Sequence, residues 1–296
     1  MTVRSVAVIG LGAMGAPIAH RVQDAGFELI VCERNPDVVA LFAGTGARVA
    51  PVPEACANAD AVLILVATPD QVWEVIMGED GILSGVTAQR SPILTVMSTV
   101  SAEVIEDIAE QLRPAGVRII DAPISGGVRG AEQGTLTILT GGDERDIKAV
   151  EPVLEKLGSQ RIHCGRLGTA QTMKIVNNII GVSVTVIAGE AYRLAMERGL
   201  DPVLVSHALE ACSGRNARSK DPAGPQVGYS EWVQDRKSYA GVGAIMRKDL
   251  TLAVEMASHA KGRYPAVRAM KSLIDSLGDE TFDHWRRIAG LPPTSD

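Results

Sequence analysis

Residues that could hold a phosphate-bearing ligand occur near the start of the chain, in the turn Gly10-Leu11-Gly12-Ala13-Met14-Gly15. The apolar run Val6–Ile9 precedes this turn and a helical stretch, Ala16–Ala25, follows it. In this pattern the first glycine permits a tight turn, the second lets a pyrophosphate approach the backbone, and the third lets the helix lie close to the strand. The free N–H groups and the positive end of the helix dipole would then face the phosphates. The sequence predicts a dinucleotide site, and a strand–turn–helix without a ligand is the alternative.

A carboxylate that could select the cofactor follows the predicted strand Glu28–Cys32, at Glu33. An acidic residue about 20 residues beyond the glycine turn commonly accepts hydrogen bonds from the ribose hydroxyls, and it repels a 2′-phosphate. Arg34 is the next residue and could attract such a phosphate. Because the carboxylate occupies the discriminating position, the sequence favours NAD over NADP.

A second set of chemically capable residues lies in a long helical stretch, Thr169–Arg198, where Lys174 and Asn178 are one turn apart. They belong to a stripe of small and polar residues between two apolar faces, formed by Ala170, Lys174, Asn178, Gly181 and Thr185. Such a stripe could line a pocket, or it could be a polar seam between helices. In a pocket, the ammonium group of Lys174 could protonate the alkoxide that hydride transfer to a carbonyl produces. Asn178 could hold the substrate oxygen or orient the lysine.

Two further segments could bind the substrate. The first, Asp121-Ala122-Pro123-Ile124-Ser125-Gly126-Gly127, follows the predicted strand Val117–Asp121. That position is the carboxyl edge of the sheet, where open α/β folds bind ligands. The hydroxyl and exposed N–H groups of Ser125, Gly126 and Gly127 suit a carboxylate, although such a turn can also serve backbone geometry alone. The second is Lys248-Asp249-Leu250, whose ammonium group would lower the pKa of Lys174 if the two lysines approached each other.

The elements that must position these residues change character halfway along the chain. Buried strands separated by helical stretches are predicted at Val6–Ile9, Glu28–Cys32, Ala61–Val66, Ile93–Met97 and Val117–Asp121. Because they are apolar on both faces, they indicate a doubly wound parallel sheet. Strict alternation predicts a half-exposed strand near one edge at Thr135–Thr140, and a last strand is expected at Arg161–Cys164.

The sequence of the second half of the chain predicts helices and no strand. Beyond the long helix, helical segments are predicted at Pro202–Ala211, Ser238–Ala260 and Tyr264–Leu277, and a long loop at Gly214–Gly228. We therefore expect an α/β dinucleotide-binding domain at residues 1–165 and an all-α substrate and oligomerisation domain at residues 166–296, joined by the long helix. The apolar faces of the long helix suggest that the chain forms a homodimer or homotetramer.

Composition narrows the class of protein. The formal net charge is −6 and no basic cluster stands out, which argues against a nucleic-acid partner. The four cysteines have no paired spacing, so we expect a reducing, cytoplasmic setting and no metal site. We find no targeting segment. The weakly polar run Ile175–Ala188 reads as too short and too polar to span a bilayer, so no membrane association is expected.

Together these motifs resemble those of the β-hydroxyacid dehydrogenase family, in family order and over nearly the whole chain. The family includes 3-hydroxyisobutyrate dehydrogenase and tartronate semialdehyde reductase and is related to 6-phosphogluconate dehydrogenase. The resemblance implies a Rossmann domain, a long interdomain helix and an all-α domain, with the active site in the cleft between the domains. It also implies a small hydroxy-acid substrate oxidised with a nicotinamide cofactor.

The resemblance assigns roles to particular residues. Lys174 matches the catalytic lysine and Asn178 the asparagine beside it. Ser125, Gly126 and Gly127 match the loop that binds the substrate carboxylate, and Lys248 matches a second lysine near substrate and cofactor. Thr99 falls in the loop that contacts the nicotinamide, and the segment Ala67-Thr68-Pro69 should lie over the adenosine side.

Two departures from the family pattern affect the substrate assignment. Ala170 replaces a frequent glycine before the catalytic lysine, and Gly241, with Tyr239 nearby, replaces a frequent phenylalanine that walls the substrate pocket. A larger pocket would suit a sugar-acid dehydrogenase of the threonate type. An imine reductase has a similar architecture but usually lacks the lysine. A dinucleotide-binding regulator without turnover or a methyltransferase would leave the lysine and serine motifs unexplained.

Overall fold

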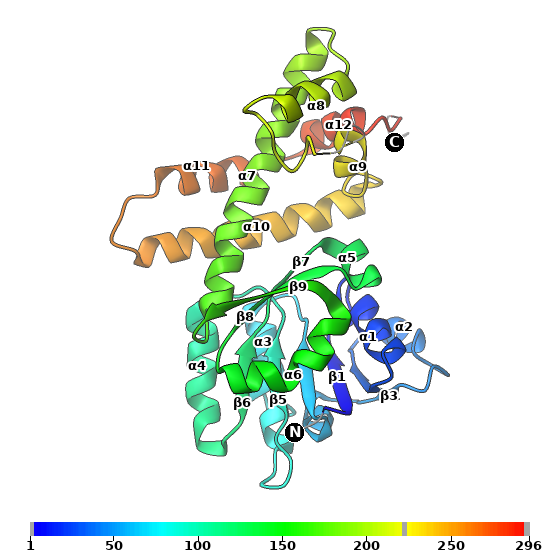
Figure 1. The fold of residues 1–296 in the computed structure, drawn as a ribbon, viewed down its shortest axis with the longest axis vertical. Coiled ribbons are helices and arrows are strands. Elements are labelled where there is room, and N and C mark those ends of the chain that lie inside the picture. Colours follow the sequence, from blue (N-terminus) through cyan, green and yellow to red (C-terminus); the bar gives the residue numbers. More distant parts are fainter. Residues whose placement is uncertain (1–2, 221–223, 293–296) are drawn as a thin grey trace. The chain divides into compact units, whose positions relative to one another are not determined.

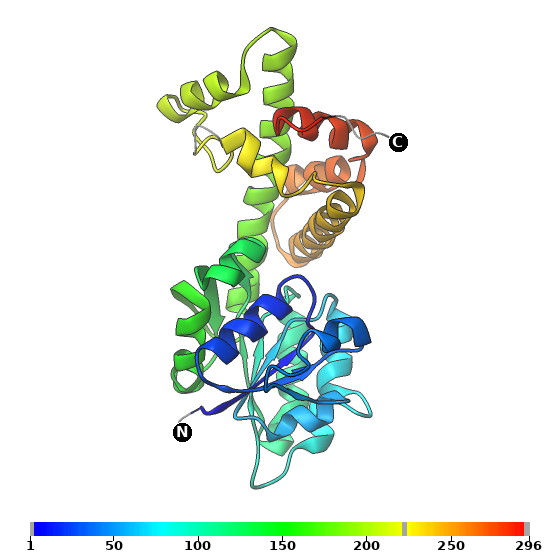
Figure 2. The ribbon, with the colours of Figure 1, turned by 90° about the vertical axis from the view of Figure 1, so that its right-hand side faces the viewer.

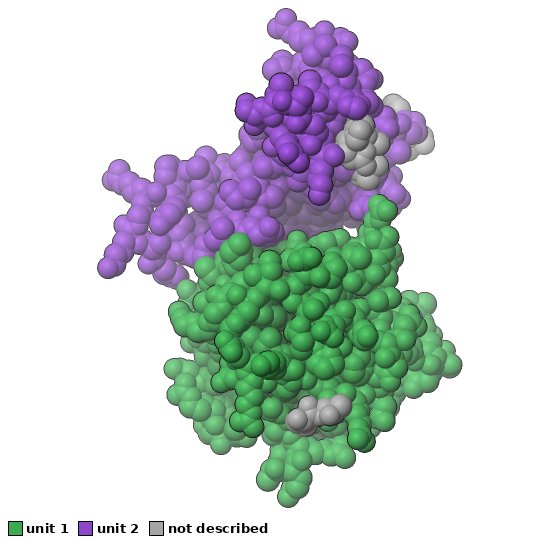
Figure 3. Space-filling view, viewed as in Figure 1, with its two compact units in different colours: residues 1–174 green, residues 175–296 purple. Residues whose placement is uncertain are grey.

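The computed structural model describes residues 3–220 and 224–292. By its internal contacts the chain divides into two compact units, Met1–Lys174 and Ile175–Asp296, shown in green and purple in Figure 3. This division falls inside the long helix α7 (Thr169–Glu197). The domain limits 1–165 and 166–296 stay a prediction.

The first unit is built on one sheet whose strands are β1 (Ser5–Ile9), β2 (Glu28–Cys32), β3 (Arg48–Val49), β4 (Ala61–Ile64), β5 (Ile93–Val96), β6 (Arg118–Asp121), β7 (Ile124–Ser125), β8 (Leu136–Gly141) and β9 (Gly158–Gly165). Their order is β3-β2-β1-β4-β5-β6-β8-β7, and β9 pairs with β8. All pairs from β3 to β6 are parallel, whereas β8 runs antiparallel to β6 and β7. Because β2 and β4 flank β1, the connections turn in opposite directions there, which makes the carboxyl end of β1 a ligand-binding switch point.

Alternation along the strands supplies both faces of the sheet with apolar side chains. In β1, Val6 and Val8 belong to one core cluster, whereas Ala7 and Ile9 belong to the other. The first cluster is covered by α1 (Gly15–Asp24), α5 (Gly127–Gln133) and α6 (Glu144–Leu157), and the second by α3 (Pro69–Met77) and α4 (Ala102–Leu112). Figure 1 and Figure 2 show these helices on the two sides of the sheet. The predicted doubly wound α/β fold is confirmed.

Shorter elements complete the first unit, namely α2 (Pro36–Ala40) and the 3₁₀ turns η1 (Pro53–Asn58), η2 (Ile82–Gly85) and η3 (Arg113–Ala115). The second unit contains most of α7 and then α8 (Pro202–Ala211), α9 (Gly224–Ser230), α10 (Arg236–His259), α11 (Pro265–Asp275) and α12 (Asp279–Ile288). Within residues 175–220 and 224–292 there is no strand, which confirms the all-helical region. Its core is centred on the buried rings of Tyr192, Tyr229, Phe282 and Trp285.

Two details of the predicted organisation are wrong. The segment expected as a half-exposed strand near one edge, Thr135–Thr140, largely corresponds to β8; it lies near one edge, next to β9, but it is buried on both faces, with Leu139 6% and Thr140 2% exposed. The segment expected as a loop, Gly214–Gly228, contains the start of α9 at Gly224. Residues 221–223 of that segment lie outside the described residues.

Candidate functional site

The glycine turn after β1 has the geometry that its sequence predicts. Gly10 has φ +87°, which favours glycine, and a Cβ on Gly15 would lie 1.8 Å from the carbonyl oxygen of Gly10. A Cβ on Gly12 would meet nothing within 4 Å, so the backbone faces open space there. Helix α1 has no side-chain cap at its N-terminus; the N–H of Ala16 donates to the carbonyl of Gly12 at 3.1 Å, and the N–H of Gly15 is left to face an anion. The turn therefore fits a dinucleotide pyrophosphate.

Glu33 is joined to this turn. One carboxylate oxygen, Oε2, accepts the backbone N–H of Leu11 at 2.7 Å, and Oε1 accepts those of Arg34 at 2.8 Å and Asn35 at 3.0 Å. Burial opposes ionisation of Glu33, but the three N–H donors outweigh it and lower the pKa of the carboxyl group. The half-buried, ionised carboxylate is thus held at the carboxyl end of β2, where a ribose is recognised in this fold. The adjacent Arg34 is exposed.

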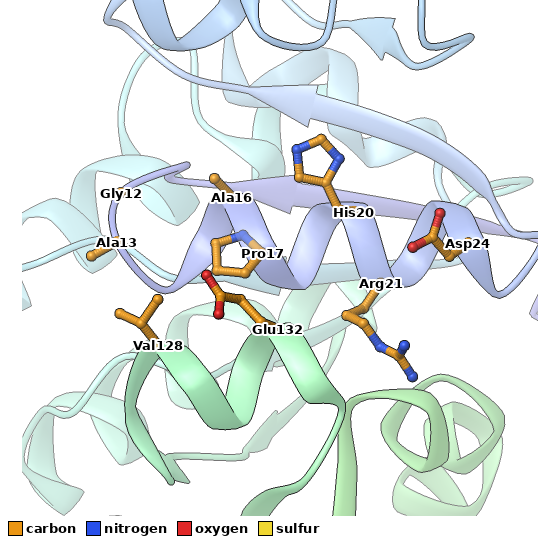
Figure 4. A pocket seen from close by; sticks show the side chains of 9 residues that line it. All are labelled: Gly12, Ala13, Ala16, Pro17, His20, Arg21, Asp24, Val128 and Glu132. Carbon is orange, nitrogen blue, oxygen red and sulfur yellow. The ribbon is translucent and has the colours of Figure 1, made fainter. Parts of the chain in front are cut away.

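A groove of about 420 Å³ begins at the glycine turn and runs between α1 and α5 (Figure 4). Gly12 and Ala13 line its mouth, α1 contributes its outer side chains, and α5 contributes Val128 and Glu132. Since α5 starts immediately after Ser125-Gly126, the structure brings the predicted cofactor turn and the predicted substrate loop to neighbouring positions in the first unit.

The substrate loop itself consists of a short strand and a helix start. Ser125 ends β7, where it pairs with Thr137 of β8. Gly126 and Gly127 both have positive φ, +132° and +65°, and α5 begins at Gly127 without a side-chain cap. A helix of seven residues has a modest dipole, but its uncapped N–H groups are donors that a carboxylate can accept from.

The other predicted cofactor residues lie at the carboxyl ends of β4 and β5. Thr68 forms a capping box at the start of α3, because its hydroxyl accepts the N–H of Gln71 while the Gln71 side chain accepts the N–H groups of Ala67 and Thr68. Pro69 occupies the first turn of that helix. Thr99 follows Ser98, whose hydroxyl donates to the carbonyl of Val66 at 2.7 Å.

A buried network that the sequence analysis missed fixes the first turn of α7. The carboxylate of Asp121 accepts the backbone N–H groups of Gly168 and Gln171, each at 2.9 Å. The Gln171 side chain donates to the carbonyl of Ser98 at 2.9 Å and accepts the N–H of Val100 at 3.1 Å. Burial raises the pKa of Asp121, although the N–H donors act against this.

Lys174 follows Gln171 by three residues on the same helix and is 8% exposed. The ends of β5 and β6 thus position the helix turn that carries the predicted catalytic lysine. The only sequence signal for this network was that Asp121 begins the motif that contains Ser125.

In the second unit, Asn178 and Lys248 meet at one carboxylate. The Asn178 side chain donates to Asp249 Oδ2 at 2.7 Å, and the Lys248 ammonium lies 2.9 Å from Asp249 Oδ1. Asn178 also accepts a hydrogen bond from Asn177 at 2.9 Å, and Asp249 is 4% exposed. The carboxylate therefore joins two predicted site residues that are 70 positions apart in the chain, a role the sequence analysis did not give to Asp249.

The Gly241 departure has a clear local consequence. A Cβ at Gly241 would meet nothing within 4 Å. The nearby Tyr239 does not fill that space, because its ring packs 5.3 Å from Phe282 and 5.9 Å from Trp285 and its hydroxyl donates to the carbonyl of Gly278. The surface at Gly241 is thus left without a large side chain of its own.

The fold, the uncapped glycine turn and the carboxylate at the end of β2 define a dinucleotide-dependent oxidoreductase. Comparison with known families agrees. Residues 5–166 match the NAD binding domain of 6-phosphogluconate dehydrogenase, and residues 168–287 match the domain described as NAD-binding of NADP-dependent 3-hydroxyisobutyrate dehydrogenase. The chain belongs to the β-hydroxyacid dehydrogenase family.

Individual relatives support the same class. The chain is 36% identical to the mitochondrial 3-hydroxyisobutyrate dehydrogenase of Mus musculus over 259 residues, which are 86% of this chain and 76% of that one. The structure of 3-hydroxyisobutyrate dehydrogenase from Mycobacterium tuberculosis with L-serine has a TM-score of 0.80 at 25% identity and covers 98% of this chain and 99% of its own. A protein named Psf3, solved with NADP⁺ and 2-OPP, has a TM-score of 0.78 at 26% identity, with coverage of 92% and 93%. The predicted family and the predicted 3-hydroxyacid dehydrogenase activity are confirmed, and the enzyme uses a nicotinamide cofactor.

Proposed function

We propose that this enzyme reversibly oxidises a 3-hydroxy carboxylate of the 3-hydroxyisobutyrate or tartronate semialdehyde/glycerate type, with Lys174 as the general acid and base. The observation that carries this proposal is the burial of Lys174 in a helix turn fixed by Asp121 and Gln171. A lysine is rarely buried to 8% exposure without a function or a partner, and a rigid turn is what a proton donor requires.

Each predicted site residue has a task in this reaction. A bound nicotinamide supplies the hydride acceptor. Lys174 takes the proton from the substrate hydroxyl in oxidation and returns it in reduction. The donors of Ser125, Gly126 and Gly127 hold the substrate carboxylate. Asn178, oriented by Asp249, holds the substrate oxygen.

Lys248 supplies a second positive charge toward substrate and cofactor. If the two ammonium groups approach each other, this charge would lower the pKa of Lys174.

The substrate class has chemical support from one relative. The structure from Mycobacterium tuberculosis was solved with L-serine, which carries a carboxylate and a hydroxyl on its third carbon. A second candidate is a sugar acid of the threonate type. The open space at Gly241 favours it, since additional hydroxyl-bearing carbons need room.

We propose NAD as the preferred cofactor. Glu33 is ionised and fixed by three backbone N–H groups, so it can accept hydrogen bonds from a ribose and repels a 2′-phosphate. The exposed Arg34 is the feature that acts in the opposite direction.

Self-association is proposed from a row of exposed apolar residues on α7. Met173, Ile180, Ile187 and Leu194 follow one another at seven-residue intervals and are 48%, 62%, 52% and 60% exposed. Residues at this spacing form one seam along a helix, as in helix pairs. By length and composition α7 could also cross a membrane, but the charged Glu190 and Arg193 lie within it, so we propose a second copy of the chain as the partner.

The unpaired cysteines lead us to propose a cytoplasmic location.

Replacement of Lys174 tests the mechanism. We expect Lys174→Ala to lower kcat at least about 100-fold, the range that general acid–base catalysis supplies, while the dissociation constant of NADH stays the same. Lys174→Arg should be nearly as inactive, because a guanidinium group keeps the charge but does not release its proton.

The exposed Lys148→Ala on α6 is the matched control and should behave like the wild type. The variants are assayed for NADH and NADPH formation with a panel of 3-hydroxy acids and sugar acids. Near-normal turnover of Lys174→Ala would remove the mechanism, and turnover of sugar acids alone would favour the second candidate.

A further inference from the structure

A cleft of about 610 Å³ opens at the amino ends of the strands in the first unit. It is lined by residues at or just before the starts of β1, β2, β4 and β5, and by Gly46 and Arg48 at the start of β3. Because β1 to β5 run parallel, their amino ends share one edge of the sheet, where the N-terminus is marked in Figure 1. The glycine turn and Glu33 lie at the opposite, carboxyl edge, so this cleft is separate from the proposed cofactor site.

Three arginines from separate parts of the chain bring positive charge to the cleft. Arg4 precedes β1, Arg48 begins β3 and Arg90 precedes β5, and all three are exposed. Within residues 3–220 and 224–292 none of them forms an ion pair with a carboxylate. The guanidinium group of Arg90 lies beside the carbonyl of Asn58, at 3.4 Å. Three such charges in one concave site attract an anion.

The two carboxylates that line the cleft do not cancel this charge. Asp60 is already engaged, because its Oδ2 accepts the N–H groups of Arg4 and Ser5 at 2.8 and 2.9 Å and the hydroxyl of Ser5 at 3.1 Å. Glu28 is exposed at the start of β2. The lining side chains thus carry three positive and two negative charges, in a chain whose formal net charge is −6. The cleft is a local excess of positive charge on an acidic protein.

Uncharged polar groups accompany the arginines. The side chains of Asn58 and Gln89 line the cleft and are exposed, so their amides are available as donors and acceptors. Ser91 also lines the cleft, and its hydroxyl oxygen is buried without a hydrogen-bond partner in the described part of the chain. A buried hydroxyl without a partner is uncommon in a native fold, and a polar ligand in the cleft would supply the missing partner.

We propose that this cleft binds a small sugar phosphate, with its phosphate on the arginines and its hydroxyl groups on Glu28, Asn58 and Gln89. A phosphate monoester carries close to two negative charges at neutral pH, which suits three guanidinium groups better than a single carboxylate does. Guanidinium groups also match pairs of phosphate oxygens in geometry. Carboxylate and amide groups accept hydrogen bonds from hydroxyls, and the volume of the cleft lies within the range of small-molecule sites.

Calorimetric titration with ribose 5-phosphate tests the proposal. The full-length enzyme is saturated with NADH, so that the phosphate of the probe does not enter the cofactor site. We expect ribose 5-phosphate to bind, and ribose, which lacks the phosphate, to bind at least about 10-fold more weakly, as expected for the loss of hydrogen bonds to charged groups. Absence of binding would overturn the proposal. Equal binding of inorganic phosphate and ribose 5-phosphate would overturn the role of the sugar.

Variants show where the probe binds. Arg48→Ala and Arg90→Ala should each raise its dissociation constant at least about 10-fold and leave turnover of the hydroxy acid unchanged. Arg145→Ala, an exposed arginine on α6 outside the cleft, is the matched control and should bind like the wild type. Lys174→Ala should also bind like the wild type, whatever its effect on catalysis. Binding that is lost in Lys174→Ala but kept in Arg48→Ala and Arg90→Ala would place the probe in the substrate site and overturn the proposal.

Discussion

The carboxylate of Asp121, at the end of β6, accepts the backbone N–H of Gln171 in the first turn of α7 at 2.9 Å. Through this bond, and the equivalent bond from Gly168, a strand end of the sheet fixes the helix turn that carries Lys174. A carboxylate at a helix N-terminus also interacts favourably with the helix dipole. The position of the proposed catalytic lysine is thus set by a residue that itself has no contact with the reaction in our proposal.

Replacement of this positioning residue should affect both stability and turnover. In Asp121→Asn one acceptor oxygen becomes an amide that faces an N–H donor, so we expect a loss of about 1–3 kcal/mol in the free energy of unfolding. We expect kcat to fall and the NADH dissociation constant to stay constant. Urea unfolding and steady-state kinetics measure these effects, with the exposed Asp107→Asn as control. Unchanged kcat in a destabilised variant would limit Asp121 to a structural role.

The Asn178–Asp249 pair should act as one unit. If Asp249 orients Asn178 for catalysis, Asn178→Ala and Asp249→Asn should each lower kcat/KM about 10-fold or more, the usual effect of losing a hydrogen bond to a charged group. The double variant should be little worse than either single variant, because the pair interaction is already lost. A double-mutant cycle on kcat/KM makes this comparison, and strictly additive losses would contradict the coupling.

Cofactor preference should depend on the charge of Glu33. In Glu33→Gln the size of the side chain is retained and the negative charge is removed. We expect the ratio of kcat/KM for NADH to that for NADPH to fall about 10-fold, since like charges placed together are costly. Arg34→Ala is the companion variant and should weaken NADPH use. A wild-type enzyme with a strong preference for NADPH would refute the proposed selectivity.

The hydrogen bonds to the carboxylate of Asp60 lead us to expect that the free energy of unfolding depends on pH in a defined way. This carboxylate accepts the N–H groups of Arg4 and Ser5 and the Ser5 hydroxyl at the amino ends of the strands. Burial opposes ionisation, but the hydrogen bonds outweigh it and lower the pKa of Asp60.

A carboxyl group with a lowered pKa stabilises the fold above its unfolded pKa, about 3.9, and this contribution is lost as the pH falls through the folded value. We therefore expect Asp60→Asn to be less stable than the wild type at pH 7, with the difference shrinking toward pH 3. Urea unfolding across this range measures it, and activity at pH 7 should be unchanged. A difference that grows on acidification would contradict the assignment.

The exposed seam on α7 predicts the assembly state. A charge at Ile180 or Ile187 would face the proposed second copy, so Ile180→Asp and Ile187→Asp should shift the enzyme toward a monomer. Light scattering after size-exclusion chromatography gives the mass, and Thr251→Asp on α10 is an exposed control. A monomeric wild type would end this proposal, and binding of the wild type to lipid vesicles would favour a membrane as the partner of α7.

The sequence predicted the elements whose signals are local. The glycine turn, β2 and Glu33 were readable because turn, strand and carboxylate lie within a few tens of residues of one another. Asp121 and Gln171, separated by 50 positions, were not recognised as partners because a hydrogen bond across that distance exists only after the sheet has formed. The same holds for Asn178 and Asp249, separated by 71 positions.

The two wrong predictions, at β8 and α9, also have physical explanations. The alternation of β8 indicated one exposed face, but Ile138 and Leu139 are successive apolar residues that point to opposite faces, and both are buried. Helix α9 begins at a glycine in a segment rich in glycine and proline, residues that normally oppose helices, so its sequence indicated a loop. Packing against α12 overrides that preference.

The near-contact between positions 10 and 15 constrains how this protein can evolve or be redesigned. Any side chain at Gly15 would collide with the Gly10 carbonyl, and Gly10 cannot yield easily because it is itself in a backbone conformation that other residues rarely adopt. Replacing both glycines does not remove the collision, since a side chain at Gly10 adds backbone strain to the clash caused by a side chain at Gly15. Variants designed to use another dinucleotide must therefore keep both glycines, and substitutions that change the cofactor preference belong at residues 33–35.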